Sequence, residues 1–416
     1  MAETPIVLLS SLFPHEGAPG TGLFIRERMF RVGRTMPLIV VSPRPWFPGQ
    51  SLLRRFRPGY RLPAARHEIQ DGVHVYFPLF FALPGLLRRF DGFFMALGAW
   101  RTLLRLKKQG FDFAVIDAHF AYPDGYAGTL LARWFGVPCT ITLRGTEVPH
   151  SRNPVIRPLL VRALMRADRV FSVSESLRQL AIGLGMPAAK GRVVGNGVDI
   201  DKFSPIDRRE ARRACKLPDD VKVLISVGAL VERKGFHRVI ECLPSLIDRH
   251  PGLRYLVVGG GSPEGNMEDE LRALVARLGL QSHVVFCGPM KPADLSTVLS
   301  AADVFVLATR NEGWANVFLE AMACGLPVIA TDVGGNREVV GDPALGRIVP
   351  FGDAAALGRA LDEALVQDWD RHGIVAHARA NTWDERVKVL IAEFEALARV
   401  RAGTAPAKGL SGSGKA

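Results

Sequence analysis

Long apolar runs are missing from this 416-residue chain, and no stretch reaches the roughly 18 uninterrupted apolar residues of a membrane-spanning helix. The two longest candidates, residues 78–87 and 93–100, are separated by charged side chains. The N-terminal segment has no positive charge ahead of its short apolar run and carries Glu3, which argues against a signal peptide. The sequence therefore predicts a cytoplasmic protein.

Cysteine is also scarce, because the five cysteines are scattered along the chain and include no CxxC pair. Their odd number and wide spacing argue against a disulfide framework and against a zinc cluster. Aromatic residues make up only 8% of the chain, but 48% of its residues are apolar and 23% are charged, which is typical of a globular protein. At roughly 100 to 200 residues per domain, the length predicts two domains, each with its own core.

Acidic residues are few in the first half of the chain. Residues 1–198 hold 26 Lys and Arg against 12 Asp and Glu, whereas residues 199–416 hold 27 against 29. The whole excess behind the net charge of +12 therefore lies in the first half. We expect the two halves to face different partners.

The positive charge is concentrated in a basic aromatic region, residues 44–108, where 12 basic residues and three acidic residues are interleaved with Phe, Trp and Leu. Such a pattern fits a solvated helix face whose arginine stems cover a core, an anionic membrane surface or acceptor, or nucleic acid. No signature of a DNA-binding or RNA-binding module accompanies it. We expect an anionic membrane surface as the partner and no nucleic acid.

Short β-branched runs alternate with helical patterns, which is typical of parallel α/β units. One series fills residues 1–198 and a second fills residues 199–380, with Gly and Pro breaking the periodicity near the boundary. A last amphipathic helix is expected at residues 381–400, followed by a disordered tail at 401–416. The pattern predicts two doubly wound α/β domains.

Three loops that follow predicted strands carry candidate ligand-binding residues. The first contains Gly20 and Gly22 before a helix, so backbone amides there could approach a phosphate or a sugar closely, although a flexible turn explains it equally well. The second places Arg233 and Lys234 just before a helix start, where two cations could clamp a diphosphate. Neither the first loop nor the glycine run at residues 259–261 has the GxGxxG dinucleotide fingerprint, which disfavours an oxidoreductase.

The third loop, in ATRNEGWANVFLEAMACGLPVIATD, carries Glu312, and Glu320 lies two turns along the helix that follows. Two carboxylates at one helix entrance suit a sugar nucleotide, whose hydroxyls can donate to them while its phosphates lie near the helix dipole.

The run EGWANVFLE resembles the E-x7-E motif of the retaining glycosyltransferases of family 4. The resemblance continues in order through NGVDIDKF, SVGALVERKGF, LVVGGGS, CGPMKPADL and TWDERV, and it spans essentially residues 5–400. It implies the GT-B fold, in which two Rossmann-like doubly wound domains face a central cleft and a C-terminal helix packs back on the N-terminal domain. It also implies a nucleotide-diphosphate sugar as donor and retention of the anomeric configuration.

The resemblance assigns donor-binding roles to residues of the second domain. Arg233 and Lys234 would hold the diphosphate, Glu320 would bind the ribose hydroxyls, and Glu312 would contact the transferred sugar. The phosphate site would be completed by the backbone amides of Gly313, Trp314, Ala315, Asn316 and Val317.

The nucleobase would lie against the loop that contains Met290 and Lys291. No metal or other cofactor is expected, because two cations and a helix dipole would stabilise the leaving diphosphate. Of two formal DxD matches, residues 199–201 lie in the interdomain joint and residues 368–370 lie away from any strand end. We expect neither to bind a metal.

The first domain would supply the acceptor side. His119 ends a predicted strand and is a candidate for substrate binding or proton transfer, with a hydrogen-bonded structural histidine as the alternative. In TLRGTEV, Arg144 stands where many family members have a histidine, and Glu147 stands where they have an acid. Arg144 could stabilise a departing phosphate or hold an anionic acceptor, but it cannot act as a general base.

These features predict a retaining, metal-independent glycosyltransferase that moves a hexose-type sugar to a lipid-linked or polysaccharide acceptor in bacterial cell-surface glycan synthesis. It would lie on the cytoplasmic face of the inner membrane. The alternative is an epimerase-like enzyme or a catalytically silent binder that uses the same sugar nucleotide.

Overall fold

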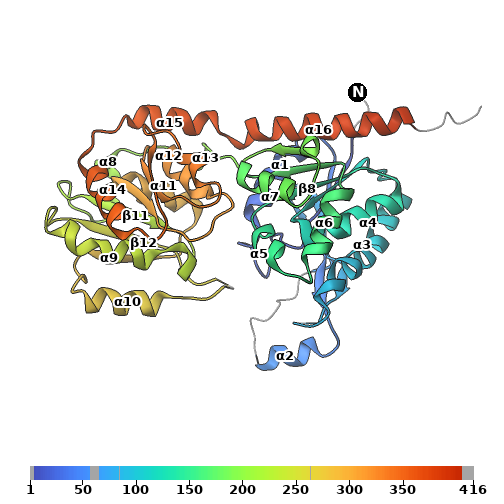
Figure 1. Cartoon of the computed structure of the whole chain (residues 1–416), viewed down its shortest axis with the longest axis horizontal. Coiled ribbons are helices and arrows are strands. Elements are labelled where there is room, and N and C mark those ends of the chain that lie inside the picture. Colours follow the sequence, from blue (N-terminus) through green and yellow to red (C-terminus); the bar gives the residue numbers. More distant parts are fainter. Residues whose placement is uncertain (1–3, 57–64, 84, 263, 405–416) are drawn as a thin grey trace, which may run out of the picture. The chain divides into compact units, whose positions relative to one another are not determined.

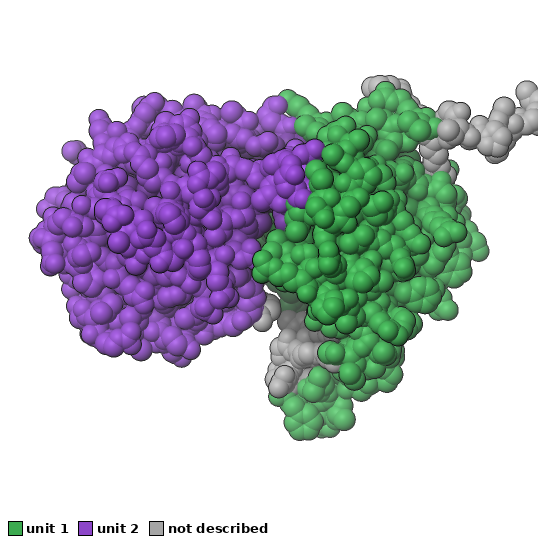
Figure 2. Space-filling view, viewed as in Figure 1, with its two compact units in different colours: residues 1–172, 180–192, 387–416 green, residues 173–179, 193–386 purple. Residues whose placement is uncertain are grey.

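The computed structural model describes residues 4–56, 65–83, 85–262 and 264–404, and these form two compact α/β units (Figures 1 and 2). Unit 1 comprises residues 1–172, 180–192 and 387–416, and unit 2 comprises residues 173–179 and 193–386. The central strands of both sheets are short apolar runs that are buried on both faces, as expected for parallel strands covered by helices.

Unit 1 is built on an eight-stranded sheet in the order β10-β9-β8-β7-β1-β2-β5-β4. Strands β9 to β5 pair in parallel in this order, and β4 joins the edge antiparallel to β5. The strands of this sheet are β1 (Ile6–Leu9), β2 (Leu38–Val41), β4 (His67–Gln70), β5 (Val73–Tyr76), β7 (Val115–His119), β8 (Cys139–Leu143), β9 (Arg169–Ser172) and β10 (Gly191–Val193). A separate parallel pair consists of β3 (Arg44–Trp46) and β6 (Leu79–Phe81).

The helices of the first half include the α/β crossovers and the segments of the basic aromatic region. They are α1 (Leu23–Gly33), α2 (Gln50–Phe56), η1 (Arg88–Phe90), α3 (Asp91–Lys108), η2 (Ala121–Gly125), α4 (Tyr126–Phe135), α5 (Glu147–Arg152), α6 (Arg157–Arg166), α7 (Glu175–Gly183) and η3 (Ala188–Lys190).

Unit 2 is built on a six-stranded parallel sheet in the order β13-β12-β11-β14-β15-β16. Its strands are β11 (Val223–Val227), β12 (Arg254–Val258), β13 (Val284–Gly288), β14 (Val304–Leu307), β15 (Val328–Thr331) and β16 (Gly346–Val349). Its helices are α8 (Arg208–Ala214), η4 (Glu232–Lys234), α9 (Phe236–Ile247), α10 (Glu268–Arg277), α11 (Pro292–Ala301), α12 (Asn316–Ala323), α13 (Asn336–Val340), α14 (Ala354–Val366) and α15 (Arg371–Ala380).

The last helix, α16 (Trp383–Thr404), begins in unit 2 and continues in unit 1. Within unit 1 its buried Phe394 meets Phe171 of β9 edge to face, and Glu393 pairs with Arg169. The helix runs beyond the residue 400 expected from the sequence, and residues 405–416 of the predicted tail lie outside the described residues.

Each sheet has one point where its strand order reverses, and this is where open α/β sheets bind ligands, beyond the carboxyl ends of the strands. In unit 1 the reversal lies between β1 and β7, and in unit 2 it lies between β11 and β14. The loops after these four strands contain most of the residues singled out by the sequence.

Candidate active site

In unit 2, the loop after β11 carries the two cations Arg233 and Lys234 and is fastened to the end of β14. The Arg310 amide and the Thr309 hydroxyl both donate to the Arg233 carbonyl oxygen, at 2.7 and 2.9 Å. At Gly235, which begins α9, a Cβ would overlap the Ala308 carbonyl oxygen. The two loops at the reversal point therefore hold each other in place.

The cations are paired with two carboxylates. Lys234 Nζ lies 2.7 Å from Glu312 Oε2, in the loop after β14. The Arg233 guanidinium donates to both oxygens of Glu264, at 2.6 and 2.9 Å, and its nearest nitrogen lies 3.7 Å from Glu312. The hydrogen bond to Glu264 is the main cause of the raised pKa of Arg233, and the same bond lowers the pKa of Glu264. The structure thus brings Arg233, Lys234 and Glu312 together, as the sequence predicted.

Two glycines in the loop after β15 pack directly against the backbone of Glu312 and Gly313. Gly334 has a left-handed φ of +54°, and a Cβ there would overlap the Glu312 carbonyl oxygen. A Cβ on Gly335 would lie 2.6 Å from the Gly313 carbonyl oxygen. This close approach of two backbones fixes the position of the Glu312 backbone.

The start of α12 packs against the segment that enters unit 2. A Cβ on Gly195 would lie 2.6 Å from the Trp314 ring, and Asn196 Nδ2 donates to Asn316 Oδ1 at 2.8 Å. The N-cap residue of α12, Ala315, has no side-chain acceptor for this end of the helix. Among the described residues no side chain accepts from its first amides, so these amides and the helix dipole suit an anion.

Glu320 lies on α12 and is half-buried. Burial raises the pKa of its carboxyl group to about 7, and the positive charge of Lys202 opposes this shift. Within the described part of the chain its carboxylate has no hydrogen-bond partner, so it can accept from a ligand.

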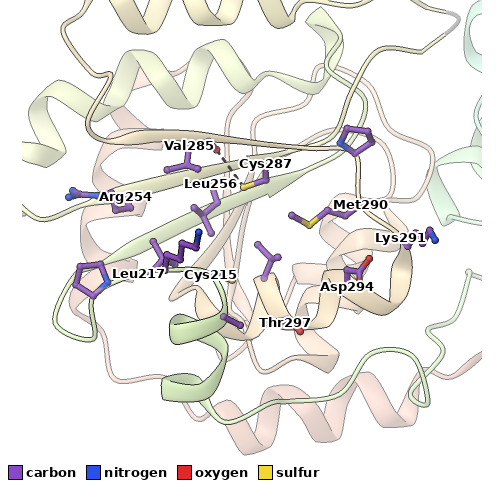
Figure 3. Close-up of a pocket in the computed structure, with 15 residues that line it drawn as sticks. Cys215, Leu217, Arg254, Leu256, Val285, Cys287, Met290, Lys291, Asp294 and Thr297 are labelled. Atoms are coloured by element: carbon purple, nitrogen blue, oxygen red, sulfur yellow. Dashed lines mark hydrogen bonds between the residues drawn. The ribbon is translucent and has the colours of Figure 1, made fainter.

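Met290 and Lys291 belong to an open groove of about 1040 Å³ (Figure 3). The groove runs between strands β12 and β13 and the helices α8 and α11, and its lining also includes Cys215, Leu217 and Arg254. Its lining residues do not include the cations of the β11 loop, so the groove is distinct from the ion-paired cluster.

In unit 1, Glu147 is buried and its carboxylate accepts from three backbone amides, those of Ala121, Arg144 and Gly145, at 3.0, 3.1 and 2.8 Å. It ties the turn after β8 to the turn after β7. His119 is fully buried at the end of β7, and the Arg144 side chain reaches it from the turn after β8. The structure therefore brings together the three residues that the sequence placed on the acceptor side.

The glycine loop after β1 is held by a buried carboxylate. Asp124 accepts from the amide and the hydroxyl of Ser11, and burial raises the pKa of this carboxyl group to about 7. At Gly22, which precedes α1 with a φ of +70°, a Cβ would overlap the Leu12 carbonyl oxygen, whereas nothing lies within 4 Å at Gly20. Of the two, only Gly22 is required by the fold.

Sequence reasoning did not single out Glu264, Gly334, Gly335 and Asn196. Two consecutive glycines before an asparagine indicate a turn at residues 334–336, but the sequence does not show which carbonyl oxygens they contact, because these lie more than 20 residues earlier. Glu264 had no signal at all, because its partner Arg233 lies 31 residues away.

The chain is similar to known proteins along most of its length. Residues 207–381 match the family of glycosyl transferases group 1, and residues 56–202 match glycosyltransferase family 4. The D-inositol 3-phosphate glycosyltransferase of Actinosynnema mirum is 34% identical over 338 residues, which cover 75% of this chain and 78% of that protein. The chain belongs to the family 4 glycosyltransferases of group 1.

Two further comparisons extend this assignment. The putative teichuronic acid biosynthesis glycosyltransferase TuaC of Bacillus subtilis is 28% identical over 344 residues, 81% of this glycosyltransferase and 83% of TuaC. The crystal structure of Anabaena Alr3699/HepE in complex with UDP-glucose matches with a TM-score of 0.65 and 18% identity, and covers 96% of this chain and 99% of that one. The predicted α/β class with GT-B architecture is confirmed. Among the described residues, no helix of this glycosyltransferase is both long and apolar enough to cross a membrane.

The close contact between Gly334 and the Glu312 backbone leads to a first prediction. Gly334→Ala should displace the Glu312 loop, because the new Cβ overlaps a carbonyl oxygen and the left-handed φ alone costs about 1 kcal/mol. Gly352→Ala is the matched control, since Gly352 also has a positive φ but nothing lies within 4 Å of its Cβ position. Denaturant unfolding should show a larger loss of stability for Gly334→Ala. Equal losses would show that the Glu312 loop shifts at little cost, and that its contact with Gly334 does not position Glu312.

The raised pKa of Glu320 gives a second prediction. Between its usual pKa of 4.5 and about 7, the folded protein keeps a proton that the unfolded chain releases. The free energy of unfolding should therefore fall as pH rises through this window, by up to about 3 kcal/mol from this group. Glu320→Gln is neutral at every pH and removes the effect.

The measurement is the difference in unfolding free energy between Glu320→Gln and the parent protein from pH 4.5 to pH 7.5. The variant should gain stability relative to the parent as the pH rises. Asp124 shifts in the same direction but is present in both proteins, so its contribution cancels. A difference that stays constant with pH would mean that the Glu320 carboxyl group is not perturbed.

Proposed function

We propose that this glycosyltransferase takes a hexose-type sugar from a nucleotide-diphosphate sugar and transfers it with retention of configuration, without a metal ion. The observation that carries the proposal is the Lys234–Glu312 ion pair beside Arg233, at the uncapped start of α12. A diphosphate needs two or more positive groups close together, and this cluster supplies Arg233 and Lys234 beside a helix start.

The ion pairs hold the cations in position until the donor arrives. Glu264 is more than half exposed and Arg233 less so, which makes their pair a contact that a diphosphate can displace at little cost. Both cations would then face the phosphates, and Glu312 would be released to accept a hydroxyl of the transferred sugar. Charge developing on the leaving diphosphate would be stabilised by Arg233, Lys234 and the α12 dipole.

The rest of the donor would be held along unit 2. Glu320, whose carboxylate has no hydrogen-bond partner among the residues that the structure describes, would accept from the ribose hydroxyls. The loop with Met290 and Lys291 would contact the nucleobase. The complex of Alr3699/HepE with UDP-glucose supports a nucleotide-sugar donor for this fold.

For the acceptor, we propose a lipid-linked or polysaccharide glycan at the cytoplasmic face of a bacterial membrane. The name of the TuaC relative, a teichuronic acid biosynthesis glycosyltransferase, supports a cell-surface glycan.

The surface that would meet the membrane lies on α3. Phe93, Leu97 and Trp100 share one face of this helix and are 42%, 40% and 38% exposed. Arg101 and Arg105 continue the same face and are exposed as well. A helix face with exposed aromatic and aliphatic side chains next to arginines is suited to the boundary between lipid headgroups and acyl chains. A small apolar groove of about 330 Å³ that includes Leu86, Leu87 and Val155 adds further exposed apolar surface to unit 1.

A nucleotide titration tests the donor site. Thermal unfolding of the protein with UDP, GDP, ADP and their sugar conjugates should show stabilisation by one nucleotide series, about 2.7 kcal/mol at a hundred times the dissociation constant. Lys234→Ala should abolish this stabilisation, because it removes the cation nearest the proposed phosphate site. Arg272→Ala, which removes an exposed arginine of α10, should leave it unchanged.

Stabilisation by no member of the panel, or equal stabilisation of the Lys234→Ala variant, would contradict the donor site. Once the donor is known, the product anomer is read by NMR and turnover is compared with and without a chelator. An inverted anomer or a loss of turnover with the chelator would reject the retaining, metal-independent mechanism. Donor binding without transfer to any acceptor would favour the silent binder.

Vesicle binding tests the α3 face. The protein should sediment with vesicles of phosphatidylglycerol and phosphatidylcholine, less at high salt and less without the anionic lipid. Replacing Phe93 and Trp100 with Ser should lower the bound fraction roughly tenfold or more, because two large apolar side chains no longer enter the bilayer. Trp134→Ser is the control, since Trp134 is an equally exposed tryptophan on α4, outside the basic aromatic region. Binding that ignores both salt and the α3 substitutions would reject this surface.

A further inference from the structure

The segment that enters unit 2 runs between the starts of two helices, α12 and α16. A Cβ on Gly195 would lie 2.6 Å from the ring of Trp314, just before α12. A Cβ on Gly197 would lie 2.3 Å from the backbone nitrogen of Trp383, the first residue of α16. All of these residues belong to unit 2. Because neither glycine has room for a Cβ, the backbone of Asn196 between them is held from both sides.

The side chain of Asn196 contacts the start of α12. It is 4% exposed, and its Nδ2 donates to Asn316 Oδ1 at 2.8 Å. Asn316 is the first residue of α12 and is only partly buried. A side-chain amide has its acceptor on the oxygen and two donors on the nitrogen, so this contact leaves both Nδ2 hydrogens of Asn316 available. Within the described residues, the Nδ2 group of Asn316 donates to no protein acceptor.

Asn316 and Glu320 lie on one face of α12, since residues four apart are neighbours on a helix surface. Four residues span about 6 Å along the helix axis. The diphosphate is proposed at the start of the helix and the ribose at Glu320, so the Asn316 amide lies between these two sites. The part of the donor that joins them is the phosphate bonded to the ribose.

The orientation of the Asn316 amide matters because the amide is a dipole. When the Nδ2 group faces the ligand, the positive end of this dipole adds to the positive end of the helix dipole. When the oxygen faces the ligand, a partial negative charge meets the phosphate and weakens its binding. A contact that fixes the Nδ2 group toward the ligand therefore favours an anion.

We propose, building on the donor site proposed above, that the Asn316 side-chain amide donates a hydrogen bond to the ribose-linked phosphate of the nucleotide sugar. Asn196 is a positioning residue, because it engages the Asn316 oxygen and touches no part of the donor. The backbone amides at the start of α12 then share the phosphates with a side chain to which the sequence assigned only a backbone role.

Titration with nucleotides and nucleosides tests the Asn316 contact. The full chain is titrated with UDP, GDP and ADP by calorimetry, and with uridine, guanosine and adenosine by ligand-detected NMR, which registers weak binding. Asn316→Ala should weaken binding of the nucleoside diphosphate that the parent protein binds by about tenfold or more, the effect expected for a lost hydrogen bond to a charged group. The matching nucleoside should bind both proteins equally, since it has no phosphate.

Asn153→Ala is the matched control. Asn153 is also a partly exposed asparagine near a helix start, because it accepts from two backbone amides just before α6 in unit 1. This variant should bind the nucleotide like the parent protein.

The outcomes separate the Asn316 contact from the donor site as a whole. Equal nucleotide affinity in Asn316→Ala and the parent protein would overturn the contact and leave the donor site in place. An equal loss for the nucleoside would also overturn it, because the substitution would then disturb the ribose or base site. If no nucleotide binds the parent protein, the donor site is rejected and the Asn316 contact with it.

A double-mutant cycle tests the positioning role of Asn196. Asn196→Ala should lower the affinity for the nucleoside diphosphate several-fold. In the Asn316→Ala background the same substitution should cause no further loss, because the amide that Asn196 orients is absent. A loss of the same size in both backgrounds, or no loss in the parent protein, would overturn the positioning role.

Asn196→Asp covers the case in which Asn196→Ala unfolds the protein. A carboxylate cannot donate, so the Asn316 amide would turn its Nδ2 group toward the new carboxylate and its oxygen toward the phosphate. The hydrogen bond is kept in the reverse sense, so the melting temperature should stay close to that of the parent protein while nucleotide affinity falls about tenfold or more. The loss should be smaller in the Asn316→Ala background. Parent-like affinity at an unchanged melting temperature would overturn the orienting role.

Discussion

Close contact between backbones at the carboxyl end of the unit 2 sheet determines where the loops that carry Lys234 and Glu312 lie. Gly235 meets the end of β14, and Gly334 and Gly335 meet the turn that carries Glu312 and Gly313. Because no Cβ separates these chains, the loops after β11, β14 and β15 have little freedom to move independently. The ion pair between Lys234 and Glu312 is a consequence of this packing, since each partner is fixed by its own loop.

Local motifs explain how much could be predicted from the sequence. Arg233, Lys234 and Glu312 stand in loops that follow recognisable strands, so strand periodicity and the family resemblance were enough to predict that they lie close together. Glu264 and Asn196 could not be found in this way, because their partners are fixed only by tertiary packing. The same holds for His119, whose position at a strand end was visible but whose ring orientation depends on Arg144, a residue on another strand's loop.

Charge counting had a similar limit in unit 1. From the sequence, the arginines of the first half of the chain look alike. In the structure some are buried and others are exposed. Arg28 lies in an amphipathic helix whose sequence gives no sign that this arginine is fully buried. Arg101 and Arg105 remain on the surface of α3. Only burial distinguishes an arginine of the core from one that meets solvent.

The path of α16 makes unit 1 discontinuous in the chain. Phe394 and Glu393 complete a core and an ion-pair cluster whose other members, Phe171, Arg169 and Arg192, lie some 200 residues earlier. A gene fragment that encodes only the first 192 residues would therefore yield a unit with an uncovered aromatic core. Recombination between relatives is constrained in the same way, since exchanging residues 193–386, the longer segment of unit 2, requires two crossover points, one on each side of that segment.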